Sequence, residues 1–163
     1  MKNLTIEIKW ALIFVLTSMA WMLLERLSGL HGQHIDKHAF YTNFFAVPAI
    51  LVYVFALRDK RNNFYEGIIS YKQAFISGLF ITLFVTLLNP LSQYIISTII
   101  SPDYFANAIA YAVDAGKMTP TEAREYFKLT SYIIQGFIGV PVMGMMTAAI
   151  VALLIKRKPA MTS

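Results

Sequence analysis

The chain has no cysteine and few charged residues. Without cysteine, disulfide bonds, thiolate nucleophiles and thiolate metal sites are excluded. Charged residues make up 14% of the 163 residues, whereas a soluble domain has about a quarter. Hydrophobic residues make up 57%, and the mean hydropathy is +0.57. The composition therefore indicates a protein embedded in a membrane.

The apolar residues form uncharged runs that are long enough to cross a bilayer core, which takes about 20 helical residues. We expect helices because backbone polar groups in lipid must be bonded internally, and the runs are too continuously apolar for barrel strands. The first run could be a signal peptide, but it ends in Glu25 and Arg26 and not in a small-residue cleavage site. The sequence predicts one membrane domain over 1–163, with spans at about residues 6–30, 39–57, 74–100 and 130–155.

Four acidic and basic residues flank the first span. Glu7 and Lys9 are expected to snorkel toward one membrane surface, with Glu25 and Arg26 near the other. Glu25 is the acid nearest the hydrocarbon. A charge within a membrane suggests a function, and the alternative is an interface acid paired with a neighbour.

The distribution of lysine and arginine predicts the orientation, because cytoplasmic segments carry an excess of both. Nine of the 14 fall before the uncharged centre of span one, between spans two and three, or after span four, and five fall on the other side. Both termini are thus expected to be cytoplasmic. The basic cluster at 58–61 could bind anionic lipid head groups or act only as a topology determinant.

The connections carry helix-capping patterns. Ser70 and Gln73 have the spacing of a capping box that would begin span three, and Thr119 and Glu122 repeat it. In the segment 101–129 we expect one helix capped by Ser101 and ended by Gly116, and a second that begins at Thr119 and continues into span four. The predicted fold is all-α, a four-helix membrane bundle with an extracytoplasmic helical hairpin between spans three and four.

Several short motifs resemble those of a known family. They are Ala56-Leu57-Arg58-Asp59-Lys60, the segment from Gly67 through Phe75 with Gly78-Leu79, Ser101-Pro102-Asp103-Tyr104-Phe105, and Lys156-Arg157-Lys158. Together they are similar to the bacterial membrane family called domain of unknown function 4199, over nearly the whole chain. The resemblance implies a protein of the bacterial inner membrane, and it brings no catalytic residue.

Three histidines are the candidate metal ligands. His31, His34 and His38 are spaced i, i+3, i+7, and imidazole binds zinc, copper or nickel, with Asp36 nearby. Gly29 and Gly32 favour an irregular loop, and a fourth ligand is lacking. We therefore predict no metal site and no cofactor, and interpret the histidines as a solvated loop that changes charge near pH 6.

Prolines recur near the middle of three spans. Pro48, Pro90 and Pro141 each remove a helix hydrogen bond, and Asn89 precedes Pro90. Kinks at similar depth could expose carbonyls around a small polar cavity that includes Asn89 and Asn43, as in transporters with interrupted helices. The alternative is ordinary proline of a membrane helix.

Small residues recur every four positions in span four, at Gly136, Gly144, Ala148 and Ala152, with Val140 between them. This spacing places them on one stripe. Because helices in lipid associate through close backbone contact, we expect span one or three of the same chain to pack there, with a second copy of the chain as the alternative partner.

No catalytic grouping is evident, so we predict that the chain is not an enzyme. The leading hypothesis is a small structural or accessory membrane protein that packs with itself or with a membrane-protein partner. The alternative is a component of a small-solute transporter or channel that uses the proline-containing helices. The basic residues flank the apolar runs, which favours contact with the lipid bilayer and not with nucleic acid.

Overall fold

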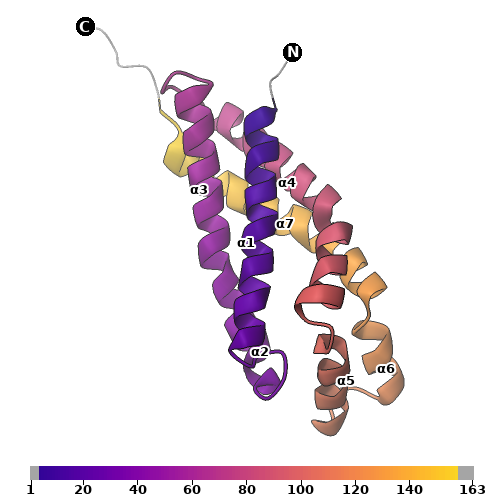
Figure 1. The fold of residues 1–163 in the computed structure, drawn as a ribbon. Helices are drawn as coiled ribbons and strands as arrows, with labels where there is room; N and C mark the ends of the chain where they lie inside the picture. The colour runs from indigo at the N-terminus through magenta and orange to yellow at the C-terminus, as the bar shows by residue number, and fades with distance from the viewer. Residues whose placement is uncertain (1–3, 158–163) are drawn as a thin grey trace, which may run out of the picture.

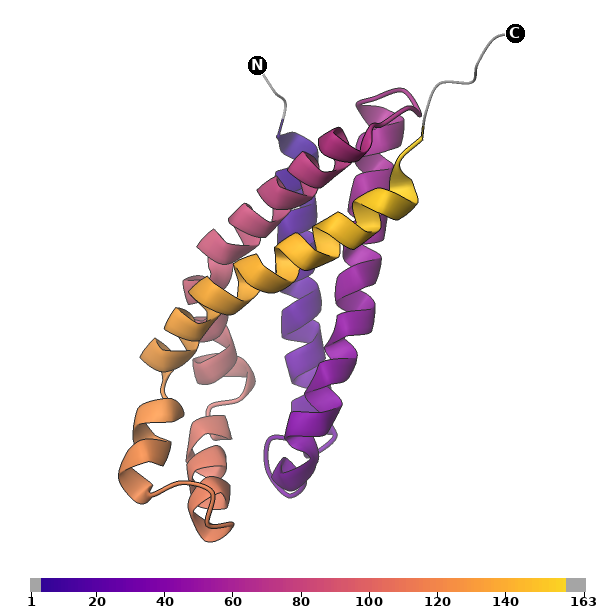
Figure 2. The ribbon, with the colours of Figure 1, turned by 180° about the vertical axis from the view of Figure 1, so that it is seen from behind.

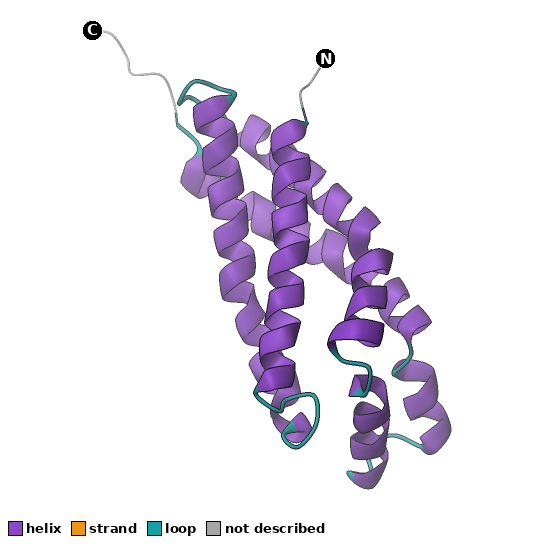
Figure 3. Cartoon of the chain, viewed as in Figure 1, coloured by secondary structure: helices purple, strands orange, loops and turns teal. Residues whose placement is uncertain are grey.

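The structure is a computed structural model that describes residues 4–157, and these form helices joined by short connections (Figure 3). Within them there is no strand, only an isolated bridge between Ile69 and Arg157. Four helical runs are long and apolar enough to cross a membrane: Thr5–Leu27, Ile35–Asn63, Tyr71–Ile100 and Leu129–Ile155. The chain is therefore all-α with four candidate membrane spans.

Two of the four runs contain irregular turns. The second joins α2 (Ile35–Tyr41), the 3-10 helix η1 (Thr42–Phe45) and α3 (Ala46–Asn63). Pro48 follows the 3-10 turn, as expected where a proline cannot donate to the carbonyl four residues earlier. The third joins α4 (Tyr71–Ile95) to the π turn η2 (Ile96–Ile100). The first and last are the single helices α1 (Thr5–Leu27) and α7 (Leu129–Ile155).

Local signals set several helix ends. The capping box at Ser70 is formed: the Gln73 N–H donates to Ser70 Oγ at 3.2 Å, and the Ser70 N–H donates to Gln73 Oε1 at 2.9 Å. α1 ends at Leu27, before the expected Leu30. Gly29, at φ +80°, takes the left-handed conformation that ends helices.

Two further helices, α5 (Tyr104–Asp114) and α6 (Pro120–Tyr126), lie between α4 and α7. Gly116, at φ +65°, follows α5, and the Thr119 capping box begins α6, as predicted. Two expectations were wrong. Asp103, and not Ser101, stands at the N-cap of α5, and α6 does not continue into α7 because Phe127 and Lys128 leave the helical conformation.

The long helices form two pairs (Figures 1 and 2). α1 lies beside α3, and α7 lies along α4, its main partner in the fold. The start of α1 and the end of α7 lie at the same end of the bundle, here called the proximal end. α5 and α6 lie toward the opposite, distal end. The α4/α7 pair is tilted against the α1/α3 pair, so that the pairs diverge distally.

The tightest packing lies in the proximal half. Ala11 of α1, Ala56 and Leu57 of α3, Ile81 of α4 and Ala148 of α7 are fully buried in one cluster. The three alanines let the helices that carry them approach their neighbours closely. The four helices are therefore closely packed at this cluster, whereas the two pairs diverge distally.

Candidate functional site

Three ionisable side chains meet near the distal end. Glu25, in the last turn of α1, is 2% exposed, and His31, in the following loop, is 3% exposed. The Nε2 atoms of His31 and His38 lie 3.2 Å and 3.3 Å from Glu25 Oε2. His38 is on α2, so the loop 28–34 folds back over the end of α1. Glu25 is therefore a buried acid with two imidazole neighbours, which corresponds to the alternative of an acid paired with its neighbours.

Further contacts hold this Glu25 cluster, which consists of Glu25, His31 and His38. The Trp21 indole donates to Glu25 Oε1 at 2.6 Å. His31 Nδ1 lies 2.9 Å from Ser101 Oγ, and Asn107 of α5 donates to the His31 carbonyl at 2.8 Å. The cluster therefore ties the α1–α2 loop to the end of the third span and to α5.

The structure corrects the interpretation of the histidine loop. His31 is buried and His38 is only 16% exposed, and the Nε2 atoms of both lie next to a buried carboxylate. Only His34 is exposed, and neither it nor Asp36 belongs to the cluster. The predicted i, i+3, i+7 alignment fails because His31 is not on a helix. The sequence feature that could have indicated this cluster is Glu25, an acid close to the hydrocarbon and six residues before His31.

Aromatic rings enclose the Glu25 cluster. The Tyr104 ring centroid lies 4.9 Å from that of His31 and 5.2 Å from that of His38. Tyr104 Oη is 3.1 Å from Tyr132 Oη. Burial raises the pKa of the Tyr104 phenol, which therefore stays protonated and neutral at physiological pH. The rings add a low-polarity wall without adding charge.

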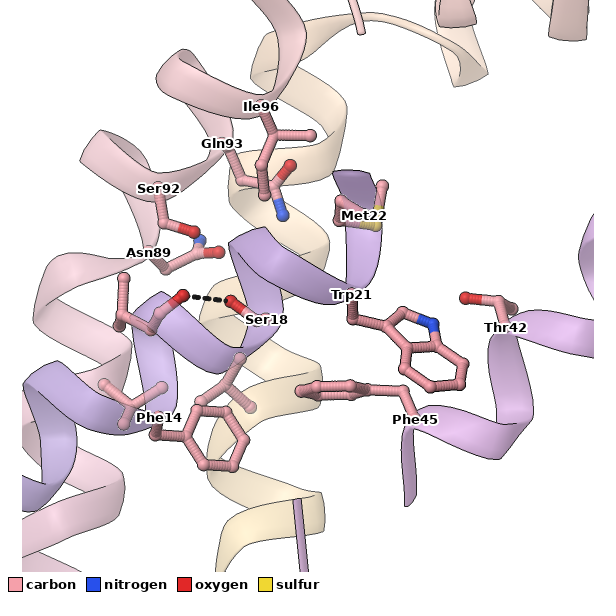
Figure 4. Close-up of a pocket in the computed structure, with 13 residues that line it drawn as sticks. Phe14, Ser18, Trp21, Met22, Thr42, Phe45, Asn89, Ser92, Gln93 and Ile96 are labelled. Atoms are coloured by element: carbon pink, nitrogen blue, oxygen red, sulfur yellow. Dashed lines mark hydrogen bonds between the residues drawn. The ribbon is translucent and has the colours of Figure 1, made fainter. Parts of the chain in front are cut away.

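A cavity of about 200 Å³ lies beside this cluster, between the diverging helix pairs (Figure 4). One wall is polar, with Asn89, Ser92 and Gln93 on α4. The other is aromatic, with Trp21 and Phe45 on α1 and η1. Trp21 belongs to both features, because its indole lines the cavity and its N–H reaches Glu25.

The chain matches a known family over residues 9–157, and that family is described as a protein of unknown function, DUF4199. The chain belongs to this family. No curated protein and no solved structure matches the chain. The expected resemblance is therefore confirmed, and the family's description assigns the DUF4199 chain no activity.

The polar cavity that the sequence suggested beside the prolines in the middle of three spans is only partly assembled in this DUF4199 chain. Asn89 lines the cavity and donates to the Ile133 carbonyl of α7 at 3.0 Å. Pro48 lines a separate groove between α1 and α3. Pro90 and Pro141 lie inside α4 and α7 and line neither the Asn89 cavity nor the groove at Pro48. The polar wall thus comes from α4 side chains, not from carbonyls freed by proline.

The small-residue stripe of this DUF4199 chain faces α4. A Cβ at Gly144 would lie 2.4 Å from Thr82 Cγ2, and one at Gly136 would lie 2.3 Å from Asn89 Nδ2. Gly78 of α4 makes the reciprocal approach, since its Cβ would lie 2.6 Å from that of Ala148. Ala148 and Ala152 are fully buried. The sequence had not singled out Gly78 or Thr82 as partners of the stripe.

A second buried ionic group lies at the proximal end. Glu7 is 2% exposed, and Lys60 Nζ lies 2.9 Å from Glu7 Oε1. The Ser77 hydroxyl donates to the same oxygen at 2.8 Å, and the ammonium stands 3.8 Å from the Phe64 ring centroid. Glu7 does not snorkel as expected, because α3 and α4 supply a cation and a hydroxyl. Lys9, by contrast, is exposed and pairs with Asp59.

Proposed function

We propose that this chain is a small, non-enzymatic, multi-pass protein of the bacterial inner membrane that acts as a structural or accessory component beside a second copy or another membrane protein. The observation that carries the proposal is the closely packed core between the two ends of the bundle. The distal cavity at Asn89 and a proximal cavity at Glu7 and Lys60 have no lining residue in common within residues 4–157. Fully buried Ala11 and Ile81 pack in the core between them. The two polar cavities are therefore separate in the monomer.

The absence of enzymatic activity is the second part of the proposal. Ser101, His31 and Glu25 form a hydrogen-bonded chain with the composition of a hydrolase triad. Ser101 is only 4% exposed, however, and lines none of the cavities described above. A nucleophile must reach its substrate, so this arrangement is better explained as a connection between the α1–α2 loop and the third span.

The oligomeric state tests the accessory role. The full chain, solubilised gently in several detergents, is expected to migrate as a homo-oligomer or with a membrane-protein partner. Crosslinking in intact membranes before solubilisation controls for detergent dissociation. A monomer under every condition, with no crosslinked species in the membrane, would contradict the proposal.

We also propose that the proximal end is cytoplasmic and that α5 and α6 form an extracytoplasmic hairpin. The nine-to-five distribution of lysine and arginine supports this orientation. Reporters fused after Ser163 or inserted near Asn62 are expected to read cytoplasmic, and one near Gly116 extracytoplasmic. A C-terminal reporter outside the cell would overturn both the orientation and the count of four spans.

The distal cavity supports a second candidate, a component that binds or moves a small solute. Its polar and aromatic walls suit a small amphipathic molecule, and it lies where the helix pairs could rock against each other. Flux of ions and small metabolites into liposomes should then fall in Asn89→Ala and stay unchanged in Gln135→Ala, an exposed residue of α7. Equal flux in both variants and the parent would remove this candidate.

A further inference from the structure

The side chains of the Glu25 cluster have the chemistry of a metal site. Glu25 Oε2 lies 3.2 Å from His31 Nε2 and 3.3 Å from His38 Nε2, and one ligand atom from each of the three residues lies within 4.8 Å of the other two. We propose that these three atoms bind one divalent transition-metal ion of the zinc type at the distal end of the bundle. This inference does not depend on the accessory role, because it concerns one chain alone.

The distances fit a common centre. Zinc bonds to imidazole nitrogen and carboxylate oxygen are about 2.0–2.1 Å, so tetrahedral geometry separates neighbouring ligand atoms by about 3.3–3.4 Å. Glu25 Oε2 lies 3.2 Å from His31 Nε2 and 3.3 Å from His38 Nε2. The carboxylate oxygen therefore already stands at the spacing from both imidazoles that a shared ion would impose.

Hydrogen bonds from outside the cluster orient two of the ligands. With Nε2 bound to a metal, His31 would carry its proton on Nδ1 and donate it to Ser101 Oγ, 2.9 Å away. Glu25 uses Oε1 to accept from Trp21, which leaves Oε2 turned to the histidines. Partners of this kind fix the tautomer and direction of metal ligands, and their loss typically weakens binding about 10–100-fold.

His38 supplies an independent observation. Its Nε2 atom is buried and has no hydrogen-bond partner, although the Glu25 carboxylate is close by. A buried nitrogen without a well-aligned hydrogen bond is costly, and a metal ion placed between the three ligands would satisfy it. The His38 side chain is 16% exposed, so its edge gives an ion a path to the site.

The donor set limits the identity of the ion. Two imidazoles and one carboxylate, with no cysteine in the chain, favour zinc and neighbouring divalent ions such as cobalt and nickel over calcium or magnesium. Three protein ligands leave one coordination position for water or a further ligand.

Cobalt(II) and zinc(II) titrations of the full chain test the proposal. The protein is purified through a tag without histidine, stripped with a chelator and reconstituted in nanodiscs. We expect one ion per chain, a visible cobalt spectrum typical of four- or five-coordination, and displacement of cobalt by zinc. Glu25→Gln and His38→Gln should each weaken binding at least about tenfold.

His34→Gln is the matched control, because this exposed histidine lies in the same segment but outside the cluster. It should bind within about twofold of the parent, since it changes the number of histidines but not the ligand set. Should Glu25→Gln fail to fold, the partly exposed His38→Gln carries the test, with its size-exclusion profile as the check on folding. No saturable binding by the parent, or equal loss in His34→Gln and His38→Gln, would overturn the site.

Discussion

Glu7 and Lys60 lie 53 positions apart in the chain and meet inside the proximal end of the bundle, with 2.9 Å between Lys60 Nζ and Glu7 Oε1. The contact joins α1 to α3, and Ser77 adds α4. A buried pair of this kind is sensitive to loss of either partner, because the remaining charge keeps its desolvation cost.

The first prediction concerns this pair. Glu7→Gln should lower the free energy of unfolding by about 3–5 kcal/mol, since the buried ammonium loses its carboxylate. The double variant Glu7→Gln, Lys60→Met should recover part of the loss, because it removes both charges. Reversible unfolding in mixed micelles measures both values.

The Lys9–Asp59 pair is the control, because the Lys9 side chain is 51% exposed. Lys9→Met should change the free energy of unfolding by less than about 1 kcal/mol. Equal destabilisation by Glu7→Gln and Lys9→Met would mean that burial does not distinguish the two pairs.

The second prediction concerns the contact of α7 with α4. Gly144→Leu should force the helices apart, because even a Cβ at this position would lie 2.4 Å from Thr82 Cγ2. Overpacking of this kind costs about 1–3 kcal/mol, and the melting temperature in detergent should fall. Gly139→Leu is the control, since nothing lies within 4 Å of its added Cβ. A fall in dimer content with unchanged monomer stability would instead assign the stripe to a contact between two copies.

The third prediction links Gly136 to Asn89. Gly136→Ala should displace the Asn89 amide, which would stand 2.3–2.5 Å from the new Cβ, and break its bond to the Ile133 carbonyl. Interhelical hydrogen bonds in membranes contribute about 0.6 kcal/mol on average. The same Gly136→Ala change in an Asn89→Ala background should cost less than in the parent. Strict additivity in this double-mutant cycle would contradict the coupling.

The fourth prediction concerns pH and α6. Hydrogen bonds from the Thr119 backbone N–H and hydroxyl hold the pKa of Glu122 below its ordinary value of 4.5. A lowered pKa means that the folded helix favours the carboxylate, so this stabilisation is present above pH 4.5 and is lost as the pH falls through the lowered value. A carboxyl NMR titration should give a Glu122 pKa that rises toward 4.5 in Thr119→Ala.

Thr119→Ala should also destabilise the first turn of α6 by about 1 kcal/mol and speed amide exchange at residues 121–125. Glu125→Gln is the control, because Glu125 pairs with Lys128 and takes no part in the capping box. An unshifted Glu122 titration in Thr119→Ala would show that Thr119 does not set this pKa.

Features that depend on a few neighbouring residues could be predicted from the sequence. The Ser70 and Thr119 capping boxes form because each joins residues three positions apart, and the apolar runs specify helices because lipid leaves the backbone no other partner. The break at Phe127 was missed, because the capping signal marks where α6 begins and not where it stops.

The tertiary structure alone decided which ionisable groups are buried and which helices meet. Glu7 finds Lys60, and Glu25 finds His38, only after separate helices have packed. The sequence identified the stripe at Gly144, but the tilt of α7 selected Thr82 of α4 as its neighbour. The same tilt separates the helix pairs distally and places Asn89 beside a cavity. Spacing along one helix defines a face, whereas the partner of that face depends on side-chain volumes and helix crossing angles throughout the bundle.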